Sequence, residues 1–589
     1  MKKFLALLLV AFTLVALVAC GGNDESSEAG SKEESQTEIK AADLVSDAFI
    51  DPVKDWAKYD KMIADIKAET DYAKRADLMH DAEDVLMSNG CVIPLYYYND
   101  IYMQKDYVEG IYANHFQTKF FLYAKMTNGA DTLRLNPASE PDYLDPALNS
   151  SADGACLAAN SFACLYTYNK DGKCEPACAE SYVVSEDGLT YTVTLKSGLK
   201  WSDGSDLTAA DYEYAWKRAA SNDTAADYGY MFSGFDGYYV DNDAEKDVAG
   251  TINVVAKDAT TLEFVLTAPC AYMEDLMAFP TFFPVKKEAV EAAADWQTAP
   301  GAWCQEAGFV SNGAYVCTGW EHDVSMTYEK NPYFYDADKV SIEKLEFMLS
   351  ADDTAIYNAY KAGDVDFIDS VPTDEIKNLK DNKEFHVIDA LGTYYVAFNC
   401  KSKLFEGKTP EEAACMRLAF SLLIDRDYIC ENVGQTGQIA ANAFLPIGMA
   451  DGNGGIFKKD LNDGGYYDAY AINEKFEETV ELARTYLKAA GFKFGEDGKL
   501  SAETPITIEY LTNDGSGHVA VAQAMQSDFS EIGISMTIAQ QDWNVFLEER
   551  KQGHFDIARE GWIADFNDPI NMLEMWTTNS GNNDCQFGR

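Results

Sequence analysis

The residues Gly561-Trp562-Ile563-Ala564-Asp565-Phe566-Asn567-Asp568-Pro569 set one carboxylate, that of Asp565, beside aromatic side chains and directly before an Asn-Asp-Pro turn. The run from Phe555 to Ile563 predicts a strand, and period-two alternation puts Arg559, Gly561, Ile563 and Asp565 on one face. Gly561 is expected to leave room for another backbone to approach closely. The stretch therefore predicts a binding edge rather than a catalytic centre.

Such an edge could accept an extended peptide through main-chain hydrogen bonds, with the N-terminal ammonium of the peptide at Asp565. The alternative is that Asp565 only caps the turn or pairs with Arg559, because most surface carboxylates are solvated or structural. On the residues alone, both interpretations stay open.

Motifs along most of the chain resemble those of one protein family. The stretch above resembles the "GW-x-ADYNDP" region of the oligopeptide-binding proteins of ABC importers, the family-five extracellular solute-binding proteins. Other segments follow in the order of that family: Tyr143–Pro146, Ser185–Tyr191, Gly198–Gly204, Leu207–Tyr212, Ser311–Tyr315, Lys330–Tyr333, Tyr394–Asn399, Arg417–Phe420 and Ile424–Arg426.

The resemblance implies a fold and a function class. It implies an α/β, periplasmic-binding-protein-like clamshell of type II, cluster C, with two lobes built from three domains around a hinge. Strands that alternate with helices in the second half of the chain agree with an α/β sheet covered on its faces. A ligand in the cleft would then shift an open–closed equilibrium, and the partners expected are an oligopeptide and the permease of an ABC transporter.

The resemblance also implies roles for individual residues. Asp565 would bind the ammonium of the peptide, Trp562 would wall a side-chain pocket, and Tyr228 would reach the ligand backbone, unless it only packs. Arg559 would either support Asp565 or meet a peptide carboxylate. The peptide backbone would lie between two edges, formed by Gly561 to Ile563 and by Ser150, Ser151 and Ala152, although the latter three could equally form an ordinary loop.

The N-terminus predicts a lipoprotein signal peptide. Lys2-Lys3 is followed by an apolar run and then by Leu17-Val18-Ala19-Cys20, and this apolar run is too short for a spanning helix. Cys20 is expected to be lipidated, which would hold the protein on the outer face of the cytoplasmic membrane; the alternative is an uncleaved anchor. Residues 21–42 are too polar to order themselves and predict a tether.

Composition narrows the function classes. The chain has 589 residues, enough for several domains, and a formal net charge of −50. This charge argues against binding to nucleic acid and against docking on anionic lipid, and most of it is expected on a solvated surface. We expect a monomer whose only membrane contact is the lipid anchor.

Cysteine and histidine usage predicts no metal site and no cofactor. Twelve cysteines remain besides Cys20, and export permits disulfides, although buried free thiols are the alternative. The six histidines show no H-x-H or HExxH spacing. The chain also lacks G-x-S-x-G and paired-glutamate motifs, which argues against the remote alternative of a surface hydrolase.

The segment from Asp43 to Met126 is out of place relative to the resembled family. Its predicted helices, Tyr59–Ile66 and Arg75–Met87, and its strand Cys91–Tyr98 resemble elements that close that family at its C-terminus. We therefore expect a circular permutation, which surface termini permit; the alternative is an artefact of gene assembly. The expected divisions are a signal peptide (1–20), a tether (21–42), a permuted part of domain III (43–104), domain I (105–164 and 298–390), domain II (165–297) and domain III (391–589).

The cargo class is less sharply predicted than the fold. The resembled family also includes binders of dipeptides, nickel, haem and sugars. If Asp565 binds an α-amine, the ligand is expected to be a peptide. The motif Phe566–Pro569 resembles the oligopeptide-binding branch of the family more than the dipeptide-binding branch.

Overall fold

A computed structural model describes residues 39–136, 139–238, 252–463 and 476–589. The predicted signal peptide, Cys20 and the tether lie outside these residues, except for the last residues of the tether, of which Ala41 is buried in helix α2 (Ala41–Leu44). Residues Lys40–Arg589 form one compact unit. No helix in the described part of the chain combines the length and apolarity needed to cross a membrane.

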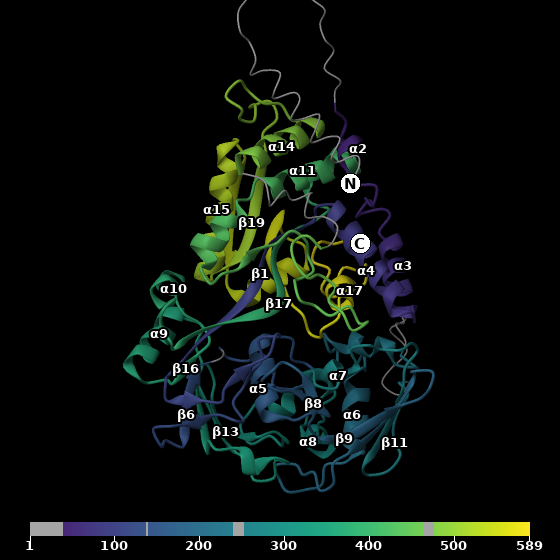
Figure 1. Ribbon diagram of the computed structural model, residues 1–589, viewed down its shortest axis with the longest axis vertical. Coiled ribbons are helices and arrows are strands. Elements are labelled where there is room, and N and C mark those ends of the chain that lie inside the picture. Colours follow the sequence, from purple (N-terminus) through teal and green to yellow (C-terminus); the bar gives the residue numbers. More distant parts are fainter. Residues whose placement is uncertain (1–38, 137–138, 239–251, 464–475) are drawn as a thin grey trace, which may run out of the picture. The chain divides into compact units, whose positions relative to one another are not determined.

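One large mixed sheet organises the described residues (Figure 1). Its middle is formed by β1 (Val92–Gln104) and β17 (Phe385–Phe398), which pair antiparallel over most of their length. Parallel and antiparallel pairs both occur, so this is the mixed α/β architecture that the sequence predicts. The strand order is β13 (Tyr315–Glu321), β14 (Ser325–Lys330), β15 (Lys344–Met348), β6 (Thr132–Asn136), β16 (Phe367–Ile368), β1, β17, β21 (Ile557–Ile563), β19 (Thr507–Asn513) and β20 (Ser535–Gln541), with β18 (Ile439–Ala440) beside β1.

The sheet continues across the predicted border between domains I and III. Strand β1 pairs with β16 near one end and with β17 along the rest, and β17 also pairs with β21. The register of β1 on β17 shifts between Pro94 and Tyr96 and between Tyr97 and Asn99. Such bulges bend a strand and increase its twist. Because the sheet is continuous, its strands do not mark the border between domains I and III, and the domain limits given above stay a prediction.

A smaller sheet lies within residues 165–297. It has the order β11 (Val254–Ala256), β12 (Thr261–Val265), β10 (Thr190–Leu195) and β9 (Ala179–Val184), and α6 (Ala209–Ala219) packs on it. Thr208 is the N-cap of α6, and its backbone N–H donates to the Asp211 carboxylate. The buried Trp216 ring packs against Phe264 of β12.

The first helices of the compact unit pack against its last elements (Figure 1). Helix α3 (Ala57–Ala68) contacts α17 (Ile570–Glu574), and the Tyr59 hydroxyl donates to the Leu573 carbonyl at 2.9 Å. The Gly588 N–H donates to the Pro52 carbonyl at 2.9 Å. Residues more than 500 positions apart thus share one core.

Both helices predicted above are confirmed, with ends shifted by a few residues: Tyr59–Ile66 lies in α3 and Arg75–Met87 in α4 (Tyr72–Ser88). Helix α4 begins after Asp71, whose side chain accepts from the Ala73 and Lys74 N–H groups. Other helices of the described residues are α5 (Ala152–Ser161), α7 (Met273–Leu276), α9 (Asp353–Ala362), α11 (Pro410–Leu422), α14 (Phe476–Ala489), α15 (Ser516–Glu531) and α16 (Trp543–Lys551).

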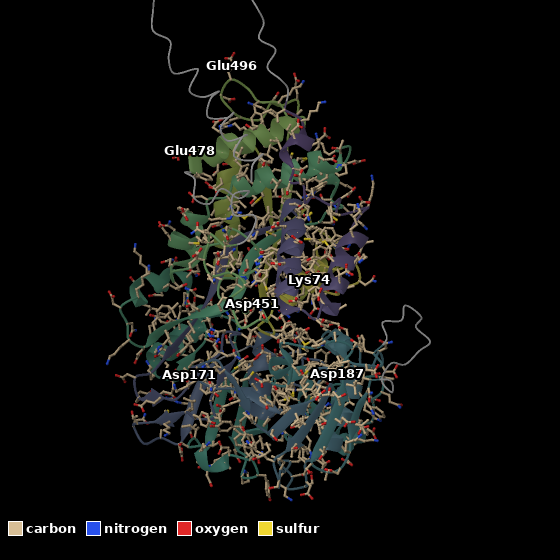
Figure 2. All side chains as sticks on the ribbon, turned by 45° about the vertical axis from the view of Figure 1, so that its right-hand side comes forward. Lys74, Asp171, Asp187, Asp451, Glu478 and Glu496 are labelled. Carbon is tan, nitrogen blue, oxygen red and sulfur yellow. The ribbon has the colours of Figure 1, made fainter. Side chains whose placement is uncertain are left out.

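The acidic residues and the cysteines lie in different surroundings. Exposed acidic side chains are distributed over separate elements, as Figure 2 shows for Asp171, Asp187, Glu478 and Glu496. The twelve cysteines in the described residues are all free, and most are buried, which is the second of the two alternatives above. Within the same residues no cluster of three or more acidic, histidine or cysteine side chains could hold a metal ion.

Candidate ligand-binding site

A cavity of about 570 Å³ opens beside strand β21. Its wall combines β21, the N-terminal end of α5, the Tyr228 region and part of α16. All nine residues singled out from the sequence line this one cavity: Ser150, Ser151, Ala152, Tyr228, Arg559, Gly561, Trp562, Ile563 and Asp565.

Strand β21 has one paired edge and one largely open edge. On one side it pairs with β17 from Phe398–Ile557 to Gly392–Ile563. On the other side β19 pairs with it only at Ile557 and Ala558. From Arg559 to Ile563 no described strand occupies the second edge, so main-chain groups along the cavity are free to pair with another chain.

Gly561 has a different neighbour from the one predicted. A Cβ atom at Gly561 would lie 2.1 Å from the hydroxyl oxygen of Tyr98, which comes from β1. The expectation that Gly561 leaves room for another backbone is therefore wrong on the side where its Cβ atom would lie. The glycine makes room for the Tyr98 ring, and this ring is itself part of the cavity wall.

Asp565 lies just past the end of β21 and is held by neutral donors. The Tyr228 hydroxyl donates to Oδ1 at 2.9 Å, and the Asn571 amide donates to Oδ2 at 2.8 Å. The Asn571 Oδ1 atom in turn accepts from the Asp565 N–H and from the Trp562 indole, at 3.1 and 3.0 Å. No Lys, Arg or His of the described residues forms an ion pair with Asp565, so the predicted alternative of an Arg559 pair is wrong.

The electrostatics of Asp565 follow from these neighbours. Burial raises the pKa of Asp565 to about 7, while the hydrogen bonds from Asn571 and Tyr228 partly oppose this rise. A carboxylate without a cation in a low-dielectric wall is unstable relative to its protonated form. A cationic group arriving through the cavity would therefore find an unpaired acceptor.

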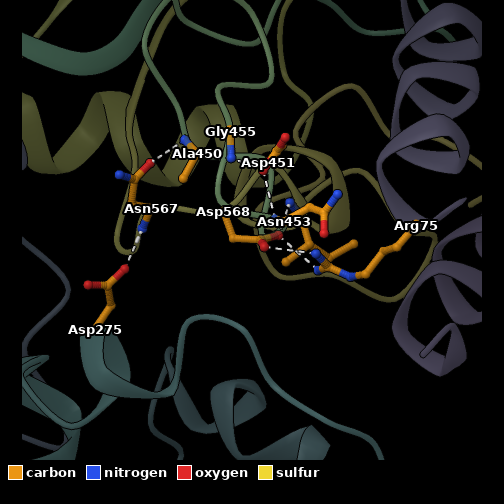
Figure 3. A network of polar contacts seen from close by, with 9 residues as sticks. Arg75, Asp275, Ala450, Asp451, Asn453, Gly455, Asn567 and Asp568 are labelled. Carbon is orange, nitrogen blue, oxygen red and sulfur yellow. Dashed lines mark hydrogen bonds and ion pairs between the residues drawn. The ribbon is translucent and has the colours of Figure 1, made fainter. Parts of the chain in front are cut away.

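The turn after Asp565 is fixed by residues from distant segments (Figure 3). Arg75 of α4 donates to both oxygens of Asp568, each at 2.8 Å, and both side chains are buried. The Asn567 N–H donates to Asp275 of α7 at 2.9 Å, and the Asn567 side chain accepts from the Ala450 N–H at 2.8 Å. These hydrogen bonds join the turn to three other segments of the chain and thereby fix its orientation.

Arg559 lies on β21 with its guanidinium buried among aromatic rings. It is 9% exposed, and its Nη2 atom is 3.0 Å from His518 Nε2. Its central carbon lies 5.6 to 5.9 Å from three ring centroids, those of Tyr394, Trp543 and Phe546. Burial, and then the Arg559 charge, hold the pKa of His518 well below its usual range, so His518 is neutral. The Nε atom of Arg559 has no hydrogen-bond partner among the described residues.

Ser150, Ser151 and Ala152 form the start of a helix rather than a sheet edge. Ser151 is the N-cap of α5, and its hydroxyl accepts from the Gly154 N–H at 3.1 Å. The Ser151 backbone is extended, with φ −113° and ψ 150°. This geometry leaves one extended residue in the cavity wall, directly before the helix.

Several cavity residues were not found from the sequence. Tyr98, His518, Trp543 and Arg550 line the cavity, and Asn571 holds Asp565 without lining the cavity itself. Their contacts join separate elements of the fold, so no motif in the sequence marks them. The run of aromatic residues in β1 was a weak signal for Tyr98.

Comparison with known proteins assigns the chain to a class. The family model described as "Bacterial extracellular solute-binding proteins, family 5 Middle" matches residues 173–584. The oligopeptide-binding protein OppA of Bacillus subtilis is 32% identical over 473 residues, which cover 78% of this chain and 80% of that protein. The periplasmic oligopeptide-binding protein OppA of Salmonella typhimurium is 30% identical over 461 residues, covering 77% and 79%.

Solved structures support the same fold. The Escherichia coli murein tripeptide binding protein MppA matches with a TM-score of 0.66 and 26% identity, covering 78% of this chain and 84% of that one. The Haemophilus influenzae OppA in complex with the peptide RPPGFSPFR matches with a TM-score of 0.65 and 25% identity, covering 78% and 85%. The periplasmic-binding-protein-like α/β fold predicted from the sequence is thereby confirmed.

Proposed function

Since the chain belongs to the bacterial extracellular solute-binding proteins of family 5, we propose that it captures oligopeptides outside the cytoplasm and delivers them to an ABC transporter. Members of this family are binding proteins without enzymatic activity, so the alternative of a surface hydrolase is wrong. The relatives named above bind oligopeptides, and this chain carries a cavity with the groups that such a ligand needs.

One observation supports peptide binding most strongly. The open edge of β21 ends beside Asp565, a half-buried carboxylate that has neutral hydrogen-bond donors but no cation. An extended peptide that pairs with this edge places main-chain groups against main-chain groups. Its N-terminal ammonium then supplies the missing positive charge at Asp565.

The remaining cavity residues have complementary roles in this proposal. Gly561 to Ile563 bind one side of the peptide backbone, and Ser150 to Ala152 bind the other. Trp562 walls a side-chain pocket, and Tyr228 orients Asp565 through the hydrogen bond between them. These roles need the N-terminal end of α5 and β21 to face the same ligand, and both line the same cavity.

Arg559 is proposed to bind the C-terminal carboxylate of a short peptide. Its guanidinium is buried, lines the cavity and has no carboxylate partner among the described side chains. It lies six positions from Asp565, which in an extended chain corresponds to a backbone distance on the order of 20 Å. The side chains shorten this span, so a peptide of a few residues would join the two charges.

Location and partners complete the proposal. Cys20 would carry a lipid that holds the protein on the outer face of the cytoplasmic membrane, and residues 21–42, apart from the end that belongs to α2, would act as a tether. The protein would act as a monomer that presents the loaded, closed form to the permease. Metabolic labelling with a fatty acid, compared between wild type and Cys20→Ala, tests the anchor: label that persists in the variant would contradict it.

The order of the elements is proposed to be a circular permutation. Its support is the packing of α3 and α4 on the turn and helix that follow β21, and the hydrogen bond from Gly588 to Pro52. A variant in which residues 43–126 follow Arg589 should fold and bind the same peptides as wild type. A variant that folds but has lost the cavity contacts would contradict the proposal.

Calorimetry tests the function itself. Tetra-alanine should bind, and its N-acetylated equivalent should bind at least about tenfold more weakly, because acetylation removes the charge that meets Asp565. Equal affinity would remove Asp565 from its proposed role. The alternative ligands are dipeptides, nickel, haem and oligosaccharides. Binding of one of these in place of oligopeptides would overturn the proposal.

A further inference from the structure

A pair of buried carboxylates lies on the cavity wall, separate from Asp565. Glu560 belongs to β21, and Asp584 to the turn that follows α17. They are 2% and 5% exposed, and both line the cavity. Their cation is Arg550 of α16: its Nη1 atom is 2.7 Å from Glu560 Oε2, and its Nε atom is 2.8 Å from Asp584 Oδ2.

One guanidinium is insufficient for two carboxylates. Glu560 Oε1 and Asp584 Oδ1 accept no hydrogen bond from another group of the described residues, and the two carboxyl groups lie close enough to hydrogen-bond to each other when one of them is protonated. Burial raises the pKa of both groups, and the Arg550 charge opposes this rise. The Asp584 charge and the hydrogen bond to Asp584 raise the pKa of Glu560 further, and the more distant Arg559 charge lowers it only in part. A buried negative charge without its own cation is costly, so the pair either holds a proton or receives a cation from outside.

Arg559 does not fill this need, although it is adjacent in sequence. Successive strand residues point to opposite faces, so Glu560 and Trp562 lie on one face of β21, and Arg559 and Gly561 on the other. Arg559 contacts His518, and the Gly561 side faces the Tyr98 hydroxyl. The acidic pair therefore belongs to the Trp562 side of the cavity.

A peptide along the open edge of β21 would also alternate its side chains between these two faces. Some of its side chains would then extend toward the face that carries Glu560. Met575 and Asn582 line the cavity as well, and they offer apolar and polar contacts for a long aliphatic stem that ends in a charge.

We propose that Glu560 and Asp584 form an acidic subsite that accepts a basic side chain, of lysine or arginine, from the bound peptide. This inference rests on the proposed function, because it assumes that a peptide pairs with β21. The ammonium or guanidinium supplies the positive charge that the two carboxylates lack, and the proton that they otherwise hold leaves to solvent. The subsite makes the cavity selective for sequence, whereas the contacts at Asp565 and along the edge are common to all peptides.

The experiment compares lysine with norleucine, which has an aliphatic side chain of similar length and no charge. Each position of tetra-alanine is replaced in turn by either residue, and affinities are measured by calorimetry. Lysine should bind at least about tenfold more tightly than norleucine at one position, or at two positions with one residue between them. In Glu560→Gln and Asp584→Asn this ratio should fall toward one.

The ratio within each variant cancels any general loss of capture. Asp227→Asn is the matched control, because Asp227 lines the same cavity but is exposed, with its carboxylate 4.0 Å from the Lys551 ammonium. This variant should keep the lysine preference. Circular dichroism and tetra-alanine binding report whether each variant has folded.

The outcomes separate this inference from the proposed function. If wild type binds no peptide at all, the function fails. If it binds tetra-alanine and binds lysine and norleucine peptides equally, only the acidic subsite is wrong, and the two carboxyl groups share a proton instead. A lysine preference that is unchanged in Glu560→Gln and Asp584→Asn would also overturn it. The wild-type comparison needs no variant, so it decides the matter even if both variants misfold.

Discussion

Asp565 and Asp568 are three residues apart and both belong to the turn after β21, yet their surroundings are opposite in kind. Asp568 is fully buried and receives two hydrogen bonds from the Arg75 guanidinium. Asp565 receives hydrogen bonds only from Tyr228 and Asn571, and it borders the cavity. A carboxylate with its own cation serves the fold, whereas one that lacks a cation is available to a ligand.

The largest expected effect is on the paired side of this comparison. Arg75→Ala leaves the Asp568 charge buried without a partner, and it should lower the free energy of unfolding by roughly 3–5 kcal/mol. Denaturant unfolding followed by circular dichroism measures this loss. Lys74→Ala is the control, because Lys74 is exposed and should change stability little. Equal stability of the two variants would show that the Arg75 pair does not hold the turn.

On the unpaired side, Asp565→Asn should affect binding rather than stability. The amide keeps an oxygen for one of the two donors but removes the charge, so tetra-alanine should bind at least about 30-fold more weakly. The loss of stability should be smaller than in Arg75→Ala, since no charge is left unpaired. Calorimetry and denaturant unfolding of the same samples give both values. If Asp565→Asn lost as much stability as Arg75→Ala but bound tetra-alanine like the wild type, the comparison would be reversed.

The pH dependence of binding sharpens the contrast. Because the pKa of Asp565 is about 7, its ionised fraction falls about tenfold per pH unit well below 7, and the affinity for an ammonium falls with it. Affinity should thus rise with pH up to about 7. It should fall again when the α-amine of the peptide deprotonates, near pH 8. N-acetylated peptide should show neither limb, and identical profiles for both peptides would contradict the account.

The smallest effect concerns the hydrogen bond from Tyr228. Tyr228→Phe removes one neutral donor to Asp565, worth about 1 kcal/mol, so tetra-alanine should bind about fivefold more weakly. Since this bond lowers the pKa of Asp565, the rising limb of the pH profile should also shift to higher pH. An unchanged limb together with weaker binding would mean that Tyr228 acts on the ligand and not on Asp565.

The sequence predicted local structure well. The hydrophobic period predicted the helices Tyr59–Ile66 and Arg75–Met87, which lie in α3 and α4, and the strand Cys91–Tyr98, which overlaps β1, because these elements depend on near neighbours. The resemblance in motifs brought the nine cavity residues together, since matching motifs imply matching positions in a known fold.

What the sequence could not predict are the distant partners. Arg75 and Asp568 are 493 positions apart, and nothing in either segment marks the other as its partner. Likewise, the Tyr98 ring that fills the space at Gly561 comes from a strand far away in the chain. The predicted ion pair between Arg559 and Asp565 could have been rejected from the sequence, because residues six positions apart in an extended chain are separated by about 20 Å.

The most direct measurement of the central claim is the titration of the Asp565 carboxyl carbon by ¹³C NMR, in free protein and with tetra-alanine bound. We expect a midpoint near pH 7 in the free protein, and a carboxylate that stays ionised well below that pH in the complex, because the ammonium stabilises the charge. The same midpoint with and without bound peptide would contradict the claim that Asp565 is kept without a cation for the ligand.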